Sequence, residues 1–278
     1  MTNASLYIQR SLEANPLREP VLRSAIQSLG LPLGSCGLDA GCGIGLQALL
    51  LAQAVGPNGH ITGMDIVSEL LAFGKDHVRQ AGYSDRIKFC QGDVSGLPFN
   101  NDSFDWVWSA DCIGYPLGVL APILEELVRV VRPRGSVIIL GWSSQQLLPG
   151  YPLLEARLNA TCSGYIPFLE GKNPELNFLR AMRWFREVGL EEVKAQTFVG
   201  DVQAPLGSGE RAALISLFEM LWGQPQPQVA PEDWKEYQRL CEPGSSDFIL
   251  DIPDYYAFFT YSMFRGKVPL VGSQRTNG

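Results

Sequence analysis

The segment Gly37-Leu38-Asp39-Ala40-Gly41-Cys42-Gly43-Ile44-Gly45 decides the fold of this chain, because it predicts a buried strand, a glycine-rich turn and a helix start in direct succession. The apolar run 46–52 continues the helix, and Gly56-Pro57 ends it. Glycines in the turn can adopt positive φ and have no Cβ, so a ligand can lie directly against the backbone. The helix start adds unpaired N–H groups and the positive end of the helix dipole. This arrangement favours a nucleotide-like ligand.

An acid precedes the first glycine of the turn. Asp39 stands at the predicted carboxyl end of the strand, where its negative charge would repel a pyrophosphate and attract a cationic group. The spacing G-x-G-x-G also departs from the dinucleotide pattern G-x-G-x-x-G, whose sixth position here is Leu46. Both observations favour a ligand with an amino acid end and no phosphate.

These residues resemble a known family. Residues 39–45 agree with every fixed position of D/E-x-G-x-G-x-G, the first motif of the class I S-adenosylmethionine-dependent methyltransferases. The resemblance implies that the turn, with Gly41 and Gly43, holds the methionine end of S-adenosylmethionine and that Asp39 lies near its α-amino group. It covers residues 35–142, and more weakly residues up to 200 and 255–266. Within the family, the chain is similar to the small-molecule branch that includes the ubiquinone and menaquinone biosynthesis methyltransferases.

A second acid ends the next predicted strand, residues 60–66. Asp65 follows Gly45 at the interval that carries a chain through one helix and back to the adjacent parallel strand. A carboxylate there can accept hydrogen bonds from both ribose hydroxyls. Ile66 would then rest on the adenine. The resemblance implies an acid with this role at the same place.

Two further strand ends complete the predicted cofactor site. Asp93 and Val94 follow a strand at 86–91, and the resemblance implies that they contact the amino group and ring face of adenine; an Asp in such a turn can equally cap its own backbone. The next strand, residues 104–109, is close to the family's F-D-x-V pattern. Its carboxyl end, from Ser109 onward, should face the transferable methyl group, because ligands of open α/β sheets bind outside strand carboxyl ends.

Candidate catalytic residues follow that strand. Transfer of a methyl group from a sulfonium is an in-line displacement, so the main task is to hold the nucleophile aligned in a dry site. A base would help a hydroxyl or an unactivated carbon, but His60 and His77 lie away from the expected strand carboxyl ends. Asp111 is the nearest carboxylate, although loop acids are often turn caps. Tyr115 is predicted beside it.

The order of predicted elements indicates an α/β fold, a doubly wound, seven-stranded, mostly parallel sheet of the Rossmann-like methyltransferase type, with helical insertions forming a lid. Residues 1–30 should form an N-terminal helical cap that is broken at 17–20. The methyltransferase core should comprise 31–200 and 254–268, with a lid insertion at about 143–172. Residues 201–253 are predicted to be a helical insertion that acts as an acceptor lid. A regular helix should run from Asn173 to Gly189, and the final strand should lie antiparallel beside the sixth.

Composition limits the partners. The 278 residues are 46% hydrophobic and 18% charged, enough for one sizeable core. A net charge of −7 with scattered Lys and Arg argues against nucleic acid. The sequence shows no signal peptide and no apolar window long enough for a membrane span, which predicts a cytoplasmic protein, either a monomer or a homodimer. The six cysteines form no C-x-x-C pair, so no metal site is predicted.

The predicted function is therefore transfer of a methyl group from S-adenosylmethionine to a small molecule, with S-adenosylhomocysteine as product, and with carbon or nitrogen favoured over oxygen. Four aromatic residues are expected at the rim, where they would enclose an aromatic or hydrophobic acceptor, but they could equally belong to the core: Tyr115, Trp142, Tyr165 and Phe168. A metalloid acceptor would need paired thiols, which the sequence does not show.

Two other classes remain open at this stage. A non-catalytic protein with the same cofactor-binding fold would retain Asp39 and Asp65 but have a blocked acceptor side. A nicotinamide-dependent oxidoreductase would use the same sheet, but would need a G-x-G-x-x-G turn and a Tyr/Lys or His catalytic group. Cofactor preference distinguishes the oxidoreductase from a methyltransferase.

Overall fold

The computed structural model describes residues 3–113, 120–162, 171, 173–223 and 229–270. The strands are β1 (Cys36–Ala40), β2 (His60–Asp65), β3 (Ile87–Gln91), β4 (Phe104–Ala110), β5 (Val131–Gln146), β6 (Glu191–Gln203) and β7 (Tyr256–Lys267). The α-helices are α1 (Asn3–Ser28), α2 (Leu46–Ala54), α3 (Ser68–Gln80), α4 (Leu120–Val130), α5 (Pro152–Asn159), α7 (Ala181–Glu187), α8 (Ser208–Trp222) and α9 (Pro231–Cys241). Short 3-10 turns lie at Pro174–Leu176, Phe178–Arg180 and Ile249–Asp251.

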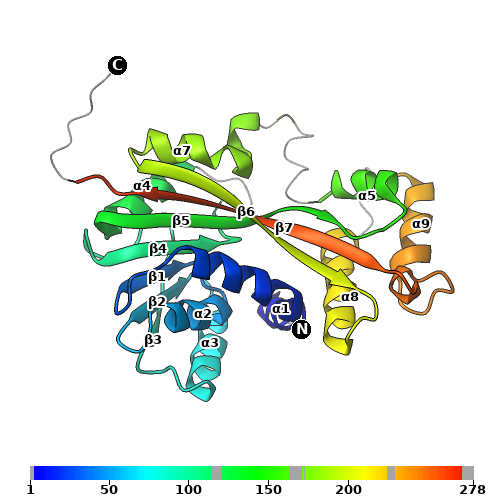
Figure 1. Ribbon diagram of the computed structural model, residues 1–278, viewed down its shortest axis with the longest axis horizontal. Coiled ribbons are helices and arrows are strands. Elements are labelled where there is room, and N and C mark those ends of the chain that lie inside the picture. Colours follow the sequence, from blue (N-terminus) through cyan, green and yellow to red (C-terminus); the bar gives the residue numbers. More distant parts are fainter. Residues whose placement is uncertain (1–2, 114–119, 163–170, 172, 224–228, 271–278) are drawn as a thin grey trace. The chain divides into compact units, whose positions relative to one another are not determined.

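The strands form one seven-stranded sheet in the order β3-β2-β1-β4-β5-β7-β6 (Figure 1). The pairs β1–β2, β2–β3, β1–β4 and β4–β5 are parallel. The chain moves outward from β1 to β3 and then returns to the other side of β1 as β4. The strand order therefore reverses between β1 and β4, and ligands of such sheets bind at the carboxyl ends beside this switch.

The last strand runs against its neighbours. Along β5 the contacts advance from Arg134, whose N–H donates to the Val268 carbonyl, to Ser143, whose hydroxyl donates to the Thr260 carbonyl. The partner number falls as the β5 number rises, so β7 is antiparallel to β5. The same holds for β6, where the contacts advance from Thr197, whose hydroxyl shares a hydrogen bond with that of Ser262, to Ala204, whose N–H donates to the Tyr255 carbonyl. The predicted mostly parallel sheet, with its final strand antiparallel beside the sixth, is confirmed.

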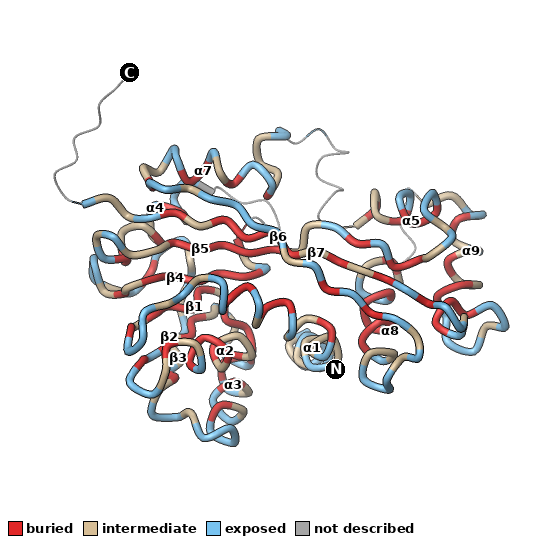
Figure 2. The backbone as a smooth tube through the Cα atoms, in the orientation of Figure 1, coloured by how far each residue is buried: buried red, intermediate tan, exposed pale blue. Residues whose placement is uncertain are grey.

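Burial explains the sequence of each strand. Buried residues dominate β1, β4 and the centre of β5, whereas the edge strand β6 is largely exposed and the other edge strand, β3, fully buries only Ile87 (Figure 2). The helices α4 and α7 contact each other and contribute to one hydrophobic cluster with β1, β4 and β5. The helices α2 and α3 pack against β2 and β3. In Figure 1, α4 and α7 lie on one face of the sheet and α2 and α3 on the other, which is the doubly wound arrangement.

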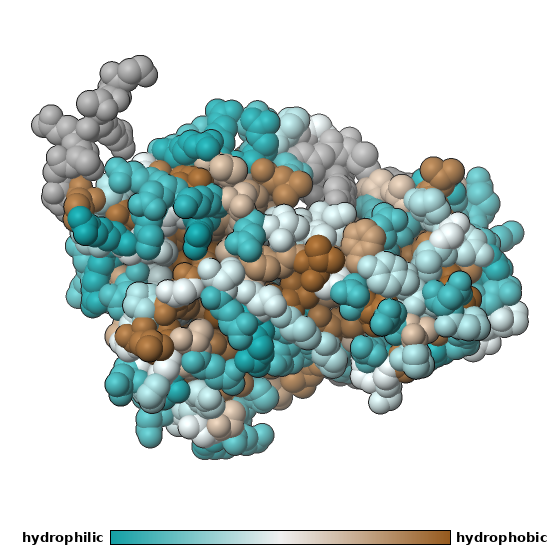
Figure 3. Space-filling view, viewed as in Figure 1, coloured by the Kyte–Doolittle hydropathy of each residue, from teal (hydrophilic) through white to brown (hydrophobic). Residues whose placement is uncertain are grey.

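Helix α7, on the same face of the sheet as α4, illustrates how burial follows the sequence. α7 buries Ala181, Trp184 and Phe185, and exposes Arg183 and Arg186. Its outer side gives the hydrophilic surface seen over α7 in Figure 3. The spacing of the buried residues matches the helical period of 3.6, so one stripe faces the core.

The chain divides into two compact units. The first comprises Met1–Leu22, Trp142–Pro174 and Phe198–Tyr261, and the second comprises Arg23–Gly141, Glu175–Thr197 and Ser262–Gly278. The second unit contains β1 to β4 and every described residue of the predicted cofactor site. Within the first unit, Arg157 on α5 forms a bidentate ion pair with Asp233 on α9, and Glu155, fully buried, accepts the N–H groups of Leu147 and Leu148.

Two helix predictions are wrong. The expected break at 17–20 does not occur, since α1 continues through Pro16 and Pro20. Both prolines are exposed and four residues apart, so the carbonyls that lose their partners can be hydrated. The regular helix expected from Asn173 to Gly189 is instead two 3-10 turns followed by α7. The Asn177 side chain accepts the Leu179 N–H and caps the second turn, an alternative to continued helix.

Within the described part of the chain, no helix combines the length and the apolar character needed to cross a lipid bilayer.

Candidate active site

The glycine turn after β1 has the predicted conformation. Gly41, Gly43 and Gly45 have φ angles of 78°, 53° and 76°, a region that side chains disfavour. The N–H groups of Gly41 and Cys42 both donate to the Met64 carbonyl, at 2.8 and 2.9 Å. The turn therefore bends toward the end of β2, and α2 begins directly after it.

Packing requires glycine at this turn as well. A Cβ on Gly41 would lie 2.3 Å from the sulfur of Cys112, and one on Gly45 would lie 2.6 Å from the ring of Phe89. Neither Cys112 nor Phe89 is part of the predicted site. The sequence contains no local signal for these contacts, because Phe89 lies on β3 and Cys112 lies just after β4.

Asp39 is a buried acid with an unsatisfied oxygen. Its side chain is 2% exposed, and its Oδ2 has no hydrogen-bond partner. Burial, and secondly the charge of Asp65, raise the pKa of Asp39 to about 8. A cationic ligand group would satisfy the oxygen and restore the charged form. The residues at this end of the sheet therefore fit a ligand with an ammonium group.

Asp65 has a structural function that the sequence did not indicate. Its Oδ2 accepts the Gly43 N–H at 2.9 Å, and its Oδ1 accepts the Val67 N–H at 3.0 Å, so the acid links β2 to the glycine turn. Each carboxylate oxygen retains a further lone pair, which leaves room for two hydroxyl donors. Ile66, the next residue, is 61% exposed and presents an apolar surface beside the carboxylate.

Asp93 caps its own turn. Its Oδ1 accepts the Ser95 N–H at 2.8 Å, and this hydrogen bond holds the pKa of Asp93 below its ordinary value. The alternative derived from the sequence, a local turn cap, thus describes its present contacts, while a contact with adenine remains a prediction. Val94 is half-buried and packs against the core.

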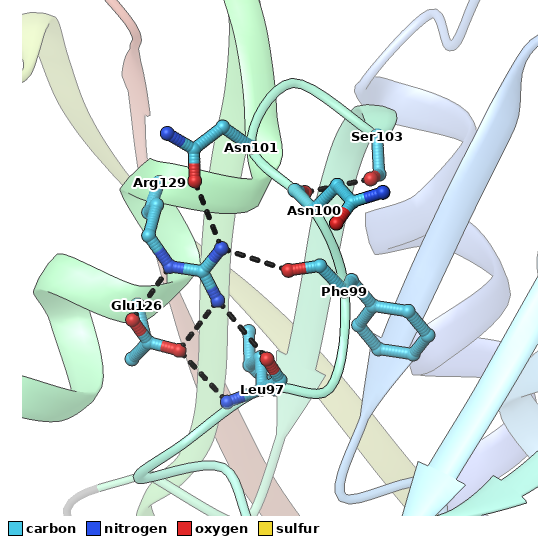
Figure 4. Close-up of polar contacts among 7 residues, drawn as sticks. All are labelled: Leu97, Phe99, Asn100, Asn101, Ser103, Glu126 and Arg129. Carbon is cyan, nitrogen blue, oxygen red and sulfur yellow. Dashed lines mark hydrogen bonds and ion pairs between the residues drawn. The ribbon is translucent and has the colours of Figure 1, made fainter.

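A single arginine anchors the following loop to α4 (Figure 4). Arg129 donates to the carbonyls of Leu97 and Phe99, at 3.0 and 2.8 Å, and to the side chain of Asn101. Glu126 pairs with Arg129 at 2.7 Å and accepts the Leu97 N–H at 2.8 Å. This network fixes the loop that follows Asp93 and Val94.

Two residues of the predicted site, Ser109 and Asp111, lie at the carboxyl end of β4. Ser109 is 1% exposed and its hydroxyl donates to the Ala40 carbonyl at 2.7 Å, which ties β4 to β1. Asp111 is exposed, has a φ of 50°, and donates its N–H to the Leu140 carbonyl at 2.9 Å. Aspartate tolerates this left-handed conformation, which is frequent at functional sites. Tyr115, Tyr165 and Phe168 lie outside the described residues.

The chain's two histidines lie elsewhere. His60 begins β2, at the opposite end of the strand from Asp65. His77 is in the last turn of α3, where its ring stacks on Phe73 with 6.1 Å between centroids. Among the described residues, no group of three or more His, Cys, Asp and Glu side chains is arranged to hold a metal ion.

Comparison with known proteins agrees with this geometry. Residues 38–135 match the family model described as a methyltransferase domain. Demethylmenaquinone methyltransferase from Bacillus velezensis is 30% identical over 194 residues, which are 64% of this chain and 81% of the relative. The Staphylococcus aureus protein of the same name is 30% identical over 197 residues, 66% of this chain and 78% of the relative. The structure of an S-adenosylmethionine-dependent methyltransferase from Aquifex aeolicus matches this chain with a TM-score of 0.51 at 16% identity. The match covers 95% of this chain and 99% of the Aquifex chain, which shows that the two share a fold.

A reversal of strand order between β1 and β4, with a D-x-G-x-G-x-G turn beside it, defines an α/β protein that binds a nucleoside-type cofactor. The chain belongs to the class I S-adenosylmethionine-dependent methyltransferases. Its cofactor is S-adenosylmethionine, and it is an enzyme that transfers the methyl group. The nicotinamide-dependent oxidoreductase and the non-catalytic binding protein are thereby set aside.

Proposed function

We propose that this methyltransferase acts on carbon or nitrogen of an aromatic or hydrophobic small molecule rather than on oxygen. The observation that carries the proposal is the carboxyl end of β4, where Asp111 is exposed while both histidines lie elsewhere. A base helps methylation of a hydroxyl by taking its proton, and histidine, the usual base, is missing from this end of the sheet, whereas an amine or an electron-rich ring carbon offers electrons directly. The names of the two relatives, both demethylmenaquinone methyltransferases, favour an aromatic ring as acceptor.

We assign the cofactor contacts as follows. The oxygen of Asp39 that has no partner receives the α-ammonium group, and the backbone at Gly41 and Gly43 receives the rest of the methionine end. The remaining lone pairs of Asp65 accept the ribose hydroxyls. Ile66 and Val94 bound the adenine, with Asp93 at its amino group, and Ser109 lies at the methyl end. When bound, the cofactor supplies a methyl group activated by the sulfonium charge.

The acceptor side rests on fewer observations. Asp111 would accept a hydrogen bond from the acceptor and orient it, and Tyr115 would bound it. Trp142 is half-buried and its indole stacks on Phe259, with 4.6 Å between ring centroids. Its place at the rim of the acceptor site stays a prediction. The following stay predictions: the lid roles of residues 143–172 and 201–253, the cap role of 1–30, the cytoplasmic location and the monomeric or homodimeric state.

The test uses deuterium-labelled S-adenosylmethionine and three acceptors: a hydroxylated naphthalene with a free ring carbon, the same ring with that carbon blocked, and an aryl amine. We expect label on ring carbon or nitrogen, located by mass spectrometry and NMR. Transfer only to oxygen would overturn the preference. Asp111→Asn should lower kcat by about 100-fold, because the acceptor loses its orienting hydrogen bond, while the affinity for S-adenosylhomocysteine stays unchanged. An equal loss of both would assign Asp111 to cofactor binding instead.

A further inference from the structure

Cys112 is a described residue near the cofactor site to which no role has been assigned. It follows β4 by two residues, and its side chain is half-buried against the glycine turn. The closeness of its Sγ and Cβ to Gly41, 2.3 and 2.6 Å from the position of a Cβ there, shows that the thiol occupies the space above that glycine. Among the described residues, no other side chain comes within 4 Å of that position.

The thiol also lies within electrostatic reach of three acids. Its pKa is raised to about 11, mainly by burial, and the carboxylates of Asp65, Asp39 and Asp111 add to the increase, while a hydrogen bond with Ser109 opposes it. These acids come from the ends of three different strands. Independently of these charges, Asp39, one of the three acids, is 2% exposed and has an oxygen without a hydrogen-bond partner, which a cationic ligand group would satisfy.

The proposed roles of these acids, on which this inference rests, place Cys112 on the cofactor. The sulfonium sulfur bears three groups: the amino acid chain, assigned to Asp39, the ribosyl group, assigned to Asp65, and the methyl group, which faces Asp111. Cys112 packs over Gly41, in the turn assigned to the methionine end, and all three acids act on its thiol electrostatically, so its side chain lies toward the atom that joins the three groups. We propose that Cys112 lines the cofactor site beside the sulfonium sulfur and acts there as a positioning residue.

The surroundings suit that place chemically. A thiolate beside a methyl sulfonium would itself accept the methyl group, forming a methyl thioether and releasing the neutral sulfide of S-adenosylhomocysteine. Burial and three carboxylates keep Cys112 in its thiol form, which is a poor nucleophile. The side chain can thus contact the sulfur without competing with the acceptor.

Protection from alkylation tests the placement in the unmodified protein. Cys112 and Cys162 are matched thiols, since both are half-buried and burial raises the pKa of each to about 11, but Cys162 belongs to the first unit. Peptide mass spectrometry would follow iodoacetamide labelling at pH 9. S-adenosylhomocysteine at ten times its Kd should slow labelling of Cys112 by about tenfold and leave Cys162 unchanged. Undiminished labelling of Cys112 in protein that calorimetry shows to be saturated would overturn the placement alone. Absence of binding would overturn the cofactor assignments with it.

A second measurement uses substitution. Cys112→Leu should fill the space beside the sulfur and weaken S-adenosylhomocysteine binding by about tenfold or more, whereas Cys162→Leu should not change it. Thermal unfolding of both variants shows whether each is folded. A folded Cys112→Leu protein with the original affinity would contradict the proposal.

Discussion

At the scale of single residues, the buried carboxyl group of Asp39 holds a proton that a cationic ligand group would displace. Burial and the neighbouring Asp65 raise its pKa to about 8 from an ordinary value of 3.8. The folded protein without ligand therefore binds this proton more tightly than the unfolded chain does. The resulting stability is fully present below about pH 3.8 and is lost as the pH rises through about 8.

A cation beside Asp39 would favour its charged form and lower its pKa, so we expect S-adenosylhomocysteine binding at pH 7 to release a proton. Calorimetry in buffers of different ionisation enthalpy measures that release. Asp39→Asn should abolish it and weaken binding by about 2 kcal/mol, or about 30-fold. The same proton release in wild type and variant would show that Asp39 does not meet the ligand's charge.

Gly41 carries both a conformational and a steric requirement, and Gly82 separates the two. Their φ angles are 78° and 79°, but a Cβ on Gly82 would meet nothing within 4 Å. We expect Gly82→Ala to cost about 1 kcal/mol of unfolding free energy, and Gly41→Ala to cost about 3 kcal/mol because it also clashes with Cys112. Urea unfolding measures both, and equal costs would exclude the steric contribution.

At the scale of elements, Arg129 and Glu126 attach a loop to α4. Arg129→Ala leaves the Leu97 and Phe99 carbonyls without this donor, so the free energy of unfolding should fall by about 2 kcal/mol in a thermal or urea measurement. The exposed ion pair of Arg79 with Asp76 is the control, and Arg79→Ala should change stability by less than about 0.5 kcal/mol. Similar losses in the two variants would contradict the anchoring function.

The pH dependence of this network has a defined sign. The hydrogen bond from Arg129 holds the pKa of Glu126 below its ordinary 4.5. The stabilisation is therefore present above about pH 4.5 and is lost as the pH falls through the lower folded-state value. The stability difference between wild type and Arg129→Ala should shrink under those acid conditions.

At the scale of the whole molecule, the described cofactor residues all belong to one of the two compact units. S-adenosylhomocysteine at 100 times its Kd should stabilise the protein by about 2.7 kcal/mol. Amide hydrogen exchange should slow at 39–45, 65–67 and 109–113, and stay unchanged in α8 and α9 of the other unit. Equal slowing in α8 and α9 would show that cofactor binding orders both units together.

Much of the second unit could be predicted because its signals are local. The turn after β1, the acids at the ends of β1 and β2, and the buried strands follow from residue order, since glycine conformation and hydrophobic periodicity act over a few positions. In the first unit, helix α8 (Ser208–Trp222) lies within residues 201–253, where helices were expected. By contrast, residues 17–20, which end in Pro20, predicted a break that did not occur, because the exposure of Pro16 and Pro20 on one helix face is a property of the folded chain.

By itself, the sequence determined the cofactor class, through Asp39 and the glycines that follow it, and the strand ends at which ligands bind. Only the tertiary structure decided that Cys112 fills the space above Gly41, that Asp65 holds the Gly43 N–H, and that Arg129 anchors the loop after β3. The physical reason is range. Backbone preference and hydrophobic period depend on neighbours in the chain, whereas these contacts join residues from separate elements, and their geometry is set by strand order, register and close packing in the core.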